Sequence, residues 1–252
     1  MKIILIVLLF SSIFAKTYTL DDVKKIKHVT YLKKNNTPLN GTIISEETSE
    51  AFDTKTGAFK QYFIRKNETP YVNGKIDGVE ISTNKYGKVE RKKFYTNGNH
   101  YMTQSFYGGF LLEENNYKNN QKHGKCKRYN IWSNKINSIS TYENAKIISV
   151  KHYYKSGEIK SVTIFKDDFP YRINVYYTTG KLKAEIIYKT LYLFERTRKE
   201  YDINGNLIYE VDINNNSTII KGYVYDKNGN KKEMNNAQLH NAKIDIDNER
   251  SL

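Results

Sequence analysis

Two interleaved series of turn residues recur along this chain, and they constrain its fold more than any other feature. In the first series an aromatic residue opens each turn, and the members lie about 22–25 residues apart: Tyr71, Tyr95, Tyr117, Tyr142, Phe165 and Tyr188. The second series has nearly the same period: Gly87, Gly109, Asn134, Gly157, Gly180, Gly205 and Gly229. Two turns per period leave strands of roughly 5–8 residues. Such a repeat predicts consecutive β-hairpins.

The turn sequences also predict which strand residues face each other. A two-residue loop at Thr179-Gly180 places Tyr177 opposite Leu182. The same reasoning places Tyr154 opposite Ile159 across the Gly157 loop, and Tyr201 opposite Leu207 across a Gly205 loop that is one residue longer. We expect positive φ at four loop glycines: Gly157, Gly180, Gly205 and Gly229.

Alternation of apolar and polar residues predicts a sheet with one packed and one solvated face. The side chains expected on the packed face of one strand are Leu182, Ala184, Ile186 and Tyr188, and those expected on its solvated face are Lys181, Lys183 and Glu185. The predicted fold is all-β: an elongated antiparallel sheet of sequential β-hairpin repeats, single-layered or open and solenoid-like, with little helix.

The pattern Y-x-N-G-K-x-x-G at Tyr71–Gly78, which Tyr117–Gly124 repeats with drift, resembles the MORN-repeat variant of bacterial YwqK-type antitoxin proteins. The resemblance covers about Pro38 to Asn230 and implies a MORN-like hairpin array. As a function it implies neutralisation of a toxin by binding. Asn120, Ala145 and Asp168 stand where the pattern has a turn glycine, so the middle copies depart from it.

The ends of the chain differ from the array, and four segments are predicted. Residues 1–15 have a basic start, an apolar core and Ala15 at the end, which is typical of a secretory signal peptide. Residues 16–39 are expected to cap the array, which occupies 40–230, and residues 231–252 form a polar tail that is helical only if it docks. The leader predicts export to the periplasm or the extracellular space.

Three segments within these regions are ambiguous. Residues 20–26 suit a short helix or a polar strand. The interval from Gly57 to Gly87 is longer than the period, which predicts an insertion near Asn67–Pro70. The most apolar internal run, Leu191–Phe194, suits a core strand or an exposed contact patch.

The formal net charge of +14 is compatible with nucleic acid, an anionic membrane or an acidic glycan as partner. Lysine is spread over outward strand positions, where it also discourages edge pairing, and this favours solvated faces over a polyanion site. Because no basic run with interleaved aromatics is present, a nucleic-acid partner is not expected. The expected partner is a protein or an envelope component, with anionic lipid as an alternative.

The residues that would carry chemistry show no recognisable pattern. No catalytic, cofactor-binding or metal-binding residues are predicted, and the one cysteine, Cys126, is expected to be a buried or half-buried strand thiol. Neighbouring acids such as Glu113-Glu114 point to opposite faces of a strand and do not form a carboxylate pair. Asp167-Asp168 lies at a turn position.

Three classes of function follow. The leading hypothesis is an exported, non-catalytic β-repeat protein that binds a protein or an envelope component. The resemblance implies a narrower version of this class, an antitoxin-like protein that neutralises a toxin by binding. The second class is a peripheral module on an anionic membrane, and the third is an enzyme that acts on glycans with carboxylates from different strands. Nothing in the sequence indicates an oligomeric state or the residues that bind.

Overall fold

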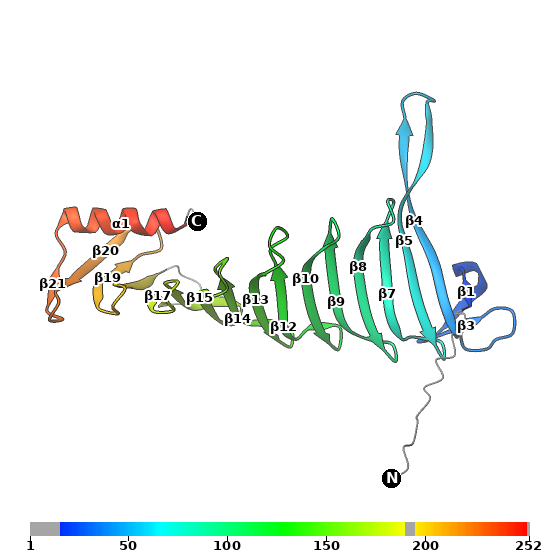
Figure 1. Ribbon diagram of the computed structural model, residues 1–252, viewed down its shortest axis with the longest axis horizontal. Coiled ribbons are helices and arrows are strands. Elements are labelled where there is room, and N and C mark those ends of the chain that lie inside the picture. The colour runs from blue at the N-terminus through cyan, green and yellow to red at the C-terminus, as the bar shows by residue number, and fades with distance from the viewer. Residues whose placement is uncertain (1–15, 190–194, 251–252) are drawn as a thin grey trace, which may run out of the picture. The chain divides into compact units, whose positions relative to one another are not determined.

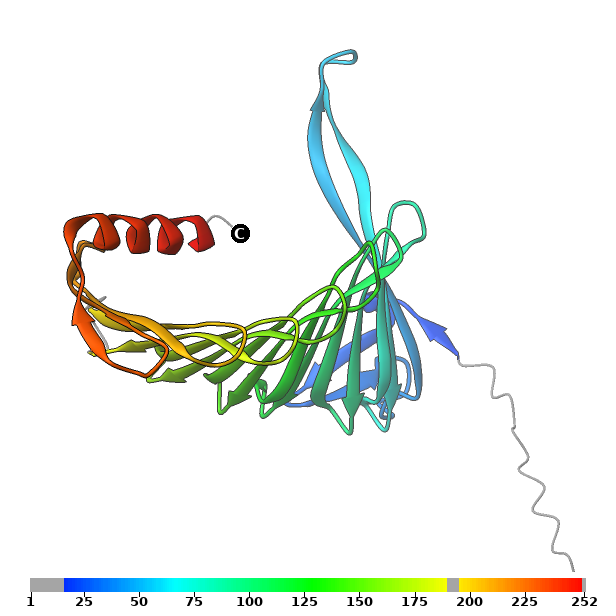
Figure 2. The ribbon, with the colours of Figure 1, turned by 60° about the vertical axis from the view of Figure 1, so that its left-hand side comes forward.

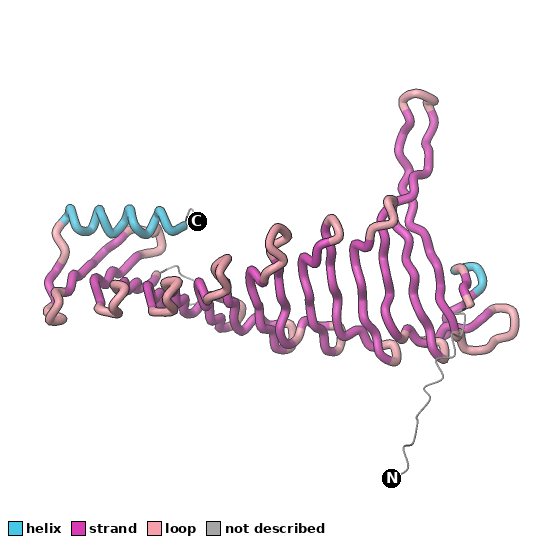
Figure 3. Tube along the Cα trace, viewed as in Figure 1, coloured by secondary structure: helices cyan, strands magenta, loops and turns pink. Residues whose placement is uncertain are grey.

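A computed structural model describes residues 16–189 and 195–250, which divide into an N-terminal unit ending at Met102 and a C-terminal unit starting at Thr103. Consecutive antiparallel hairpins build each unit (Figures 1 and 3). Strands account for 64% of the chain and helix for 6%, so the predicted all-β fold with little helix is confirmed. The expectations for residues 1–15 and for Leu191–Phe194 lie outside the described residues.

The N-terminal unit begins with short elements and continues into hairpins. Its elements are β1 (Thr17–Tyr18), the 3-10 helix η1 (Leu20–Asp22), β2 (Val23–Ile26), β3 (Val29–Leu32), β4 (Gly41–Asp53), β5 (Ala58–Val72), β6 (Lys75–Ile76), β7 (Gly78–Asn84), β8 (Val89–Thr96) and the first part of β9 (Asn99–Tyr107). Residues 20–26 are therefore helix and strand in succession. Leu39 is fully buried and accepts a hydrogen bond from Gly74 N at 2.8 Å, so the segment before β4 packs against the first turn of the array.

The insertion predicted near Asn67–Pro70 lies elsewhere. Residues 65–68 pair normally with β7, and residues 69–71 pair with the start of β4. The extra length is in the outer halves of β4 and β5, which project beyond the neighbouring hairpins of their unit as a two-stranded arm (Figure 1). Sequence spacing indicated that residues are inserted but misplaced them, because a strand extension adds no turn signal.

The C-terminal unit contains the end of β9 and the following elements: β10 (Phe110–Lys118), β11 (Gln121–Lys122), β12 (Gly124–Tyr129), β13 (Ile136–Glu143), β14 (Lys146–Tyr153), β15 (Ile159–Lys166), β16 (Phe169–Tyr176), β17 (Leu182–Tyr188), β18 (Arg196–Tyr201), β19 (Leu207–Ile213), β20 (Ile219–Tyr225), β21 (Lys231–Glu233) and α1 (Asn236–Arg250). From β12 to β21 each strand pairs antiparallel with the next.

The aromatic turn series forms two-residue loops with positive φ at both positions in its members from Tyr71 to Phe165, and the turn after Tyr188 lies outside the described residues. This conformation holds at Asn73-Gly74 and also at Asn144-Ala145, where φ is 48° and 67°. Two consecutive positive values match the type I′ turn that suits the strand twist. The loops missing the expected glycine therefore keep the same geometry, with Asn, Asp or Ala in a region that favours glycine.

The four loops of the glycine series from Gly157 to Gly229 share one length, which corrects the two lengths that we expected for them. In the loops at Gly157, Gly180, Gly205 and Gly229, the residue three positions before the glycine donates its N–H to the carbonyl of the residue that follows the glycine, as Tyr154 does to Glu158. Tyr153 and Tyr176, rather than Tyr154 and Tyr177, therefore face Ile159 and Leu182, while Tyr201 faces Leu207 as predicted. Two adjacent tyrosines at each site made the one-residue shift invisible in the sequence. Positive φ at all four glycines is confirmed.

Because of this shift, the second tyrosine of each pair forms a hydrogen bond to the next hairpin instead of a cross-strand pair. Tyr154 Oη donates to Tyr176 O at 2.6 Å, and Tyr177 Oη donates to Tyr201 O at 2.8 Å. At the equivalent position of a later loop, Asp202 accepts hydrogen bonds from N–H groups within its own loop at 2.8 Å. Tyrosines therefore tie one hairpin to the next, whereas aspartates hold the loop itself.

The tail predicted for residues 231–252 forms β21 and α1, and α1 lies across one face of β19 and β20 (Figure 2). Its buried contacts join Ala242 and Ile246 to Tyr209, Val211 and Ile213 of β19. The tail is therefore helical because it docks, and it contributes apolar residues to the core of the unit.

Candidate functional site

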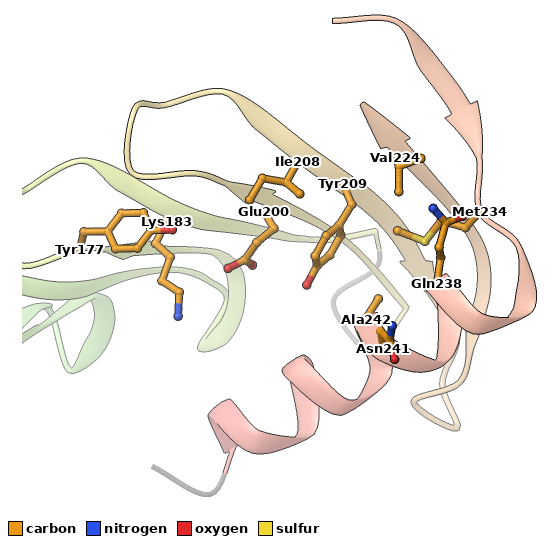
Figure 4. Close-up of a pocket in the computed structure, with 10 residues that line it drawn as sticks. All are labelled: Tyr177, Lys183, Glu200, Ile208, Tyr209, Val224, Met234, Gln238, Asn241 and Ala242. Carbon is orange, nitrogen blue, oxygen red and sulfur yellow. The ribbon is translucent and has the colours of Figure 1, made fainter. Parts of the chain in front are cut away.

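A groove of about 540 Å³ between α1 and the sheet of the C-terminal unit is the candidate site (Figure 4). Four strands, the β16–β17 loop, the linker before α1 and α1 itself line it: Tyr177, Lys183, Glu200, Ile208, Tyr209, Val224, Met234, Gln238, Asn241 and Ala242. Its volume lies within the range of ligand pockets, about 300–1,000 Å³.

Strand β18 provides the charged floor beside this groove. Arg196, Arg198 and Glu200 alternate along it and are all buried on the face that α1 covers. Glu200 Oε2 accepts hydrogen bonds from Arg198 Nε at 3.1 Å and from Nη2 at 2.8 Å. Buried charges are tolerated only when paired in this way.

The register of the sheet explains why these charges are inside. Arg198 lies opposite Ile186 of β17 and Val211 of β19, and Glu200 lies between Ala184 and Tyr209. Residues opposite each other in an antiparallel pair project from the same face. The packed face of β17 therefore continues through β18, although every residue on that face of β18 is charged.

The inner end of the groove is apolar and depends on a glycine. Gly222 of β20 lies opposite Val211, and a β-carbon at this position would be 2.6 Å from Met234 Sδ and 2.9 Å from Leu239 Cδ2. Met234 N also donates to Gly222 O at 3.0 Å. The absent side chain thus lets the linker and α1 approach the sheet.

The outer end of the groove is polar. Figure 4 shows Lys183, Glu200 and Tyr209 projecting from neighbouring strands toward the space that α1 bounds. Gln238 and Asn241 bring amide groups from α1. An apolar inner end with an ammonium, a carboxylate and two amides at its mouth suits a ligand with an apolar group and several hydrogen-bonding groups.

A smaller hollow of about 290 Å³ lies over β12–β14 of the same unit, and Cys126 is among its lining residues. Cys126 is buried, and burial raises the pKa of its thiol, so the expectation of a buried strand thiol is confirmed. Glu113 and Glu114 pair separately with Arg128 at 2.6 Å and Lys127 at 2.9 Å, and these hydrogen bonds lower the pKa of both carboxyls. The two acids therefore do not share a proton.

The predicted turn residue Asp168 is part of a structural link: its Oδ1 accepts a hydrogen bond from Ile147 N at 3.1 Å. Within the described residues no group of three or more histidine, cysteine or acidic side chains could hold a metal ion. No helix in that part of the chain is both long and apolar enough to cross a membrane.

Sequence reasoning named no binding residue and missed the groove. Lys183 and Glu185 were both expected on a solvated face, yet Lys183 lines the groove and Glu185 is buried beside Arg172. One signal could have predicted that the charges of β18 are buried. Residues of β18 that lie opposite the packed residues of β17 must share the packed face. That inference requires the pairing register across the β17–β18 connection, which the turn series does not supply.

Comparison with known proteins does not show a family. No family model matches the chain, and no curated protein matches it. Two solved structures of S. aureus TarM, one of them a mutant in complex with fondaparinux, alpha-GlcNAc-glycerol and UDP, are 15% and 16% identical over 46% of this chain and 20% of theirs, each with a TM-score of 0.24. The matching region thus spans a fifth of TarM. A Bacteroides fragilis protein of unknown function is 10% identical over 76% of this chain and 91% of its own, with a TM-score of 0.12.

These comparisons correct one expectation. We expected the chain not to be an enzyme, and this expectation is withdrawn, because the solved structures that the chain matches include TarM. A TM-score of 0.24 carries no argument about activity, so the matches do not establish an enzymatic function either.

Proposed function

We propose that this chain is an exported β-repeat protein of the MORN-like type that binds a segment of a protein partner in the groove beneath α1. The observation that carries the proposal is the groove itself, which combines an apolar inner end with a polar mouth. The leader-like residues 1–15 support export, and the hairpin repeat supports the MORN-like assignment.

The chemistry of the mouth favours a peptide-like ligand. Amide side chains such as Gln238 and Asn241 match the hydrogen-bonding groups of a peptide backbone. Lys183 and Glu200 offer one charge of each sign, which suits a segment with both donors and acceptors. The apolar lining near Val224 and Met234 accommodates one aliphatic or aromatic side chain.

Site-specific photocrosslinking tests the groove. A photoreactive residue at position 238 of the exported protein in its native host should capture a discrete partner, while the same residue at Ile220, which is 64% exposed, should not. Capture at 238 should fall when Lys183 is replaced by Glu, and persist when Lys199 on the opposite face of β18 is replaced by Glu. Equal capture at both positions, or no effect of Lys183→Glu, contradicts the groove as the binding site.

Export is tested separately. Mass spectrometry of the protein from its native host should find a mature N-terminus near Lys16 in the periplasmic or culture fraction. Soluble cytosolic protein that retains Met1 contradicts this part of the proposal and leaves the groove test unaffected.

A second candidate function is attachment to an anionic membrane, and loop residues at one edge of the C-terminal unit favour it. Trp132 is 90% exposed in the β12–β13 loop, and Tyr107 and Phe110 are exposed at the β9–β10 turn. Lys135 and Lys155 lie on loops of the same edge. Exposed aromatics beside lysines are typical of membrane interfaces.

Liposome sedimentation distinguishes the two candidates. Attachment predicts binding to vesicles that contain anionic lipid, weakening as added salt shortens the Debye length to about 8 Å at physiological strength, and loss of binding with Trp132→Ser. The matched control is Tyr86→Ser, which also removes an exposed loop aromatic. Equal sedimentation of wild type and Trp132→Ser contradicts membrane attachment through this edge.

A further inference from the structure

The arm of the N-terminal unit has open strand edges. Within that unit the outer edge of β4 pairs only with β1, at Thr42 and Ile43, and β5 pairs with β7 only from Arg65 to Glu68. Residues 48–53 and 58–63 therefore pair with each other as a two-stranded ribbon, and the described part of this unit adds no further strand to the outer edge of β4 beyond Ile43. Both ribbon views show the ribbon standing clear of the other hairpins of its unit (Figures 1 and 2).

A ribbon of this kind is marginally stable by itself in water. This one also exposes large apolar side chains: Phe59 is 71% exposed and Tyr62 47%. Proteins commonly protect an open edge with proline, lysine or a short strand. β4 is 13 residues long and contains neither proline nor lysine, so its edge lacks those three forms of protection.

The charges of the arm differ between its two strands. β4 carries only acids: Glu46, Glu47, Glu50 and Asp53. β5 carries the bases Lys60, Arg65 and Lys66, and its one acid is Glu68. Arg65 binds Glu47 at 3.2 Å and Lys60 binds Asp53 at 2.5 Å. Glu46 lies opposite Lys66 and Glu50 lies opposite Gln61, and both acids are exposed. The open edge of β4 is therefore an acidic one.

We propose that the outer edge of β4, from Ile44 to Asp53, binds a basic extended segment of a protein partner as an added antiparallel strand. Main-chain N–H and C=O groups of the edge supply the hydrogen bonds, and the acids select basic side chains on the incoming strand. A second copy paired through the same edge brings β4 acids opposite β4 acids, which is destabilising. This site is separate from the groove beneath α1.

Binding of a defined peptide to the full mature chain tests the proposal. The probe is a ten-residue peptide that alternates lysine with valine and threonine, measured by fluorescence anisotropy. Two matched peptides accompany it: one with glutamate in place of lysine, and one with the lysines kept but alternate backbone nitrogens methylated. We expect the first peptide to bind, and hydrogen exchange to slow at the amides of residues 44–53 when it does.

The variant Glu46→Lys with Glu50→Lys should weaken that binding by about tenfold, since each reversal replaces an attraction to a lysine of the peptide by a repulsion. The matched control is Glu233→Lys, which reverses an exposed acid of β21 in the other unit. Thermal melting of the double variant should follow that of the wild type, because both residues are exposed.

Several outcomes overturn the proposal. Equal binding of the methylated peptide means that charge alone holds the peptide, and equal binding of the glutamate peptide means that the acids do not select it. Unchanged exchange at residues 44–53 places the peptide elsewhere. A concentration-dependent dimer in sedimentation, with hydrogen exchange slowed at residues 44–53 as the protein concentration rises, assigns the edge to a second copy instead of a partner.

Discussion

The arm of β4–β5 and the hairpin of β18–β19 are both antiparallel strand pairs, yet the arm exposes an apolar side chain and the hairpin buries a charged one. In the arm, Phe59 is 71% exposed, while on β18 Arg198 is only 5% exposed. Both strands alternate, and both pair with neighbours in regular register. The difference is that α1 covers the face of β18–β19, whereas the described part of the N-terminal unit places nothing over the arm.

This comparison shows that strand patterning alone does not decide burial in a hairpin repeat. Each strand of a single sheet offers two faces, and burial follows from what lies against a face. Arginine at the covered face is stable because Glu200 neutralises and hydrogen-bonds it. Phenylalanine on the uncovered arm is tolerated because scattered exposed apolar residues cost a folded protein little.

The largest expected effect is at the covered end. Glu200→Ala leaves the Arg198 guanidinium buried without its main anion, and we expect a loss of about 3 kcal/mol in the free energy of unfolding. Glu210→Ala, on the opposite face of the neighbouring strand, is the matched control and should cost under about 1 kcal/mol. Urea unfolding measures both, and equal losses would remove the distinction between the two faces.

The second-largest effect is expected from a substitution that displaces α1, the helix that covers this face of the sheet. Gly222→Ala puts a methyl group 2.6 Å from Met234 Sδ, so α1 or its linker must move, at a cost of about 1–3 kcal/mol. We also expect weaker helical circular dichroism and faster hydrogen exchange in α1. The neighbouring change Ile220→Ala, at an exposed position, should leave both signals unchanged. A Gly222→Ala protein with wild-type exchange in α1 would mean that the helix does not depend on this close approach.

A smaller effect of opposite sign, a gain in the free energy of unfolding, is expected at a turn that no other element covers. Ala145 is held at φ 67°, and left-handed backbone costs a non-glycine residue roughly 1–2 kcal/mol. Ala145→Gly relieves that strain but loosens the unfolded chain, so the net gain should be about 0.5–1 kcal/mol. Gly180→Ala makes the reverse change at φ 81° in open space and should cost a similar amount. Thermal melting that shows the same sign for both variants contradicts this account.

The smallest effect is expected in the uncovered arm. Phe59→Ser and Tyr62→Ser remove exposed rings, and each should change the unfolding free energy by under about 0.5 kcal/mol. Urea unfolding of the isolated protein measures both variants. A loss above about 1 kcal/mol for either one would show that something covers the arm in solution, so that the arm would no longer differ from the β18–β19 hairpin in this respect.

The sequence by itself determined the period, the positions of the turns and the all-β class. These are local properties, because positive φ at Gly180 and the type I′ loop at Asn73-Gly74 depend on a few neighbouring residues. Even where Ala145 and Asp168 replace glycine, the loop keeps its geometry, since the strands on both sides impose it.

Only the tertiary structure decided which faces are covered, and with them the candidate sites. The one-residue shift at Tyr176, the extension of β4 and β5 into an arm, and the burial of Arg198 under α1 all depend on pairing and docking between segments distant in the sequence. A pattern with period two specifies which residues share a face, but not what packs on it. The long-range contacts of Met234 and Ala242 with β19 and β20 determine which face of the sheet is covered.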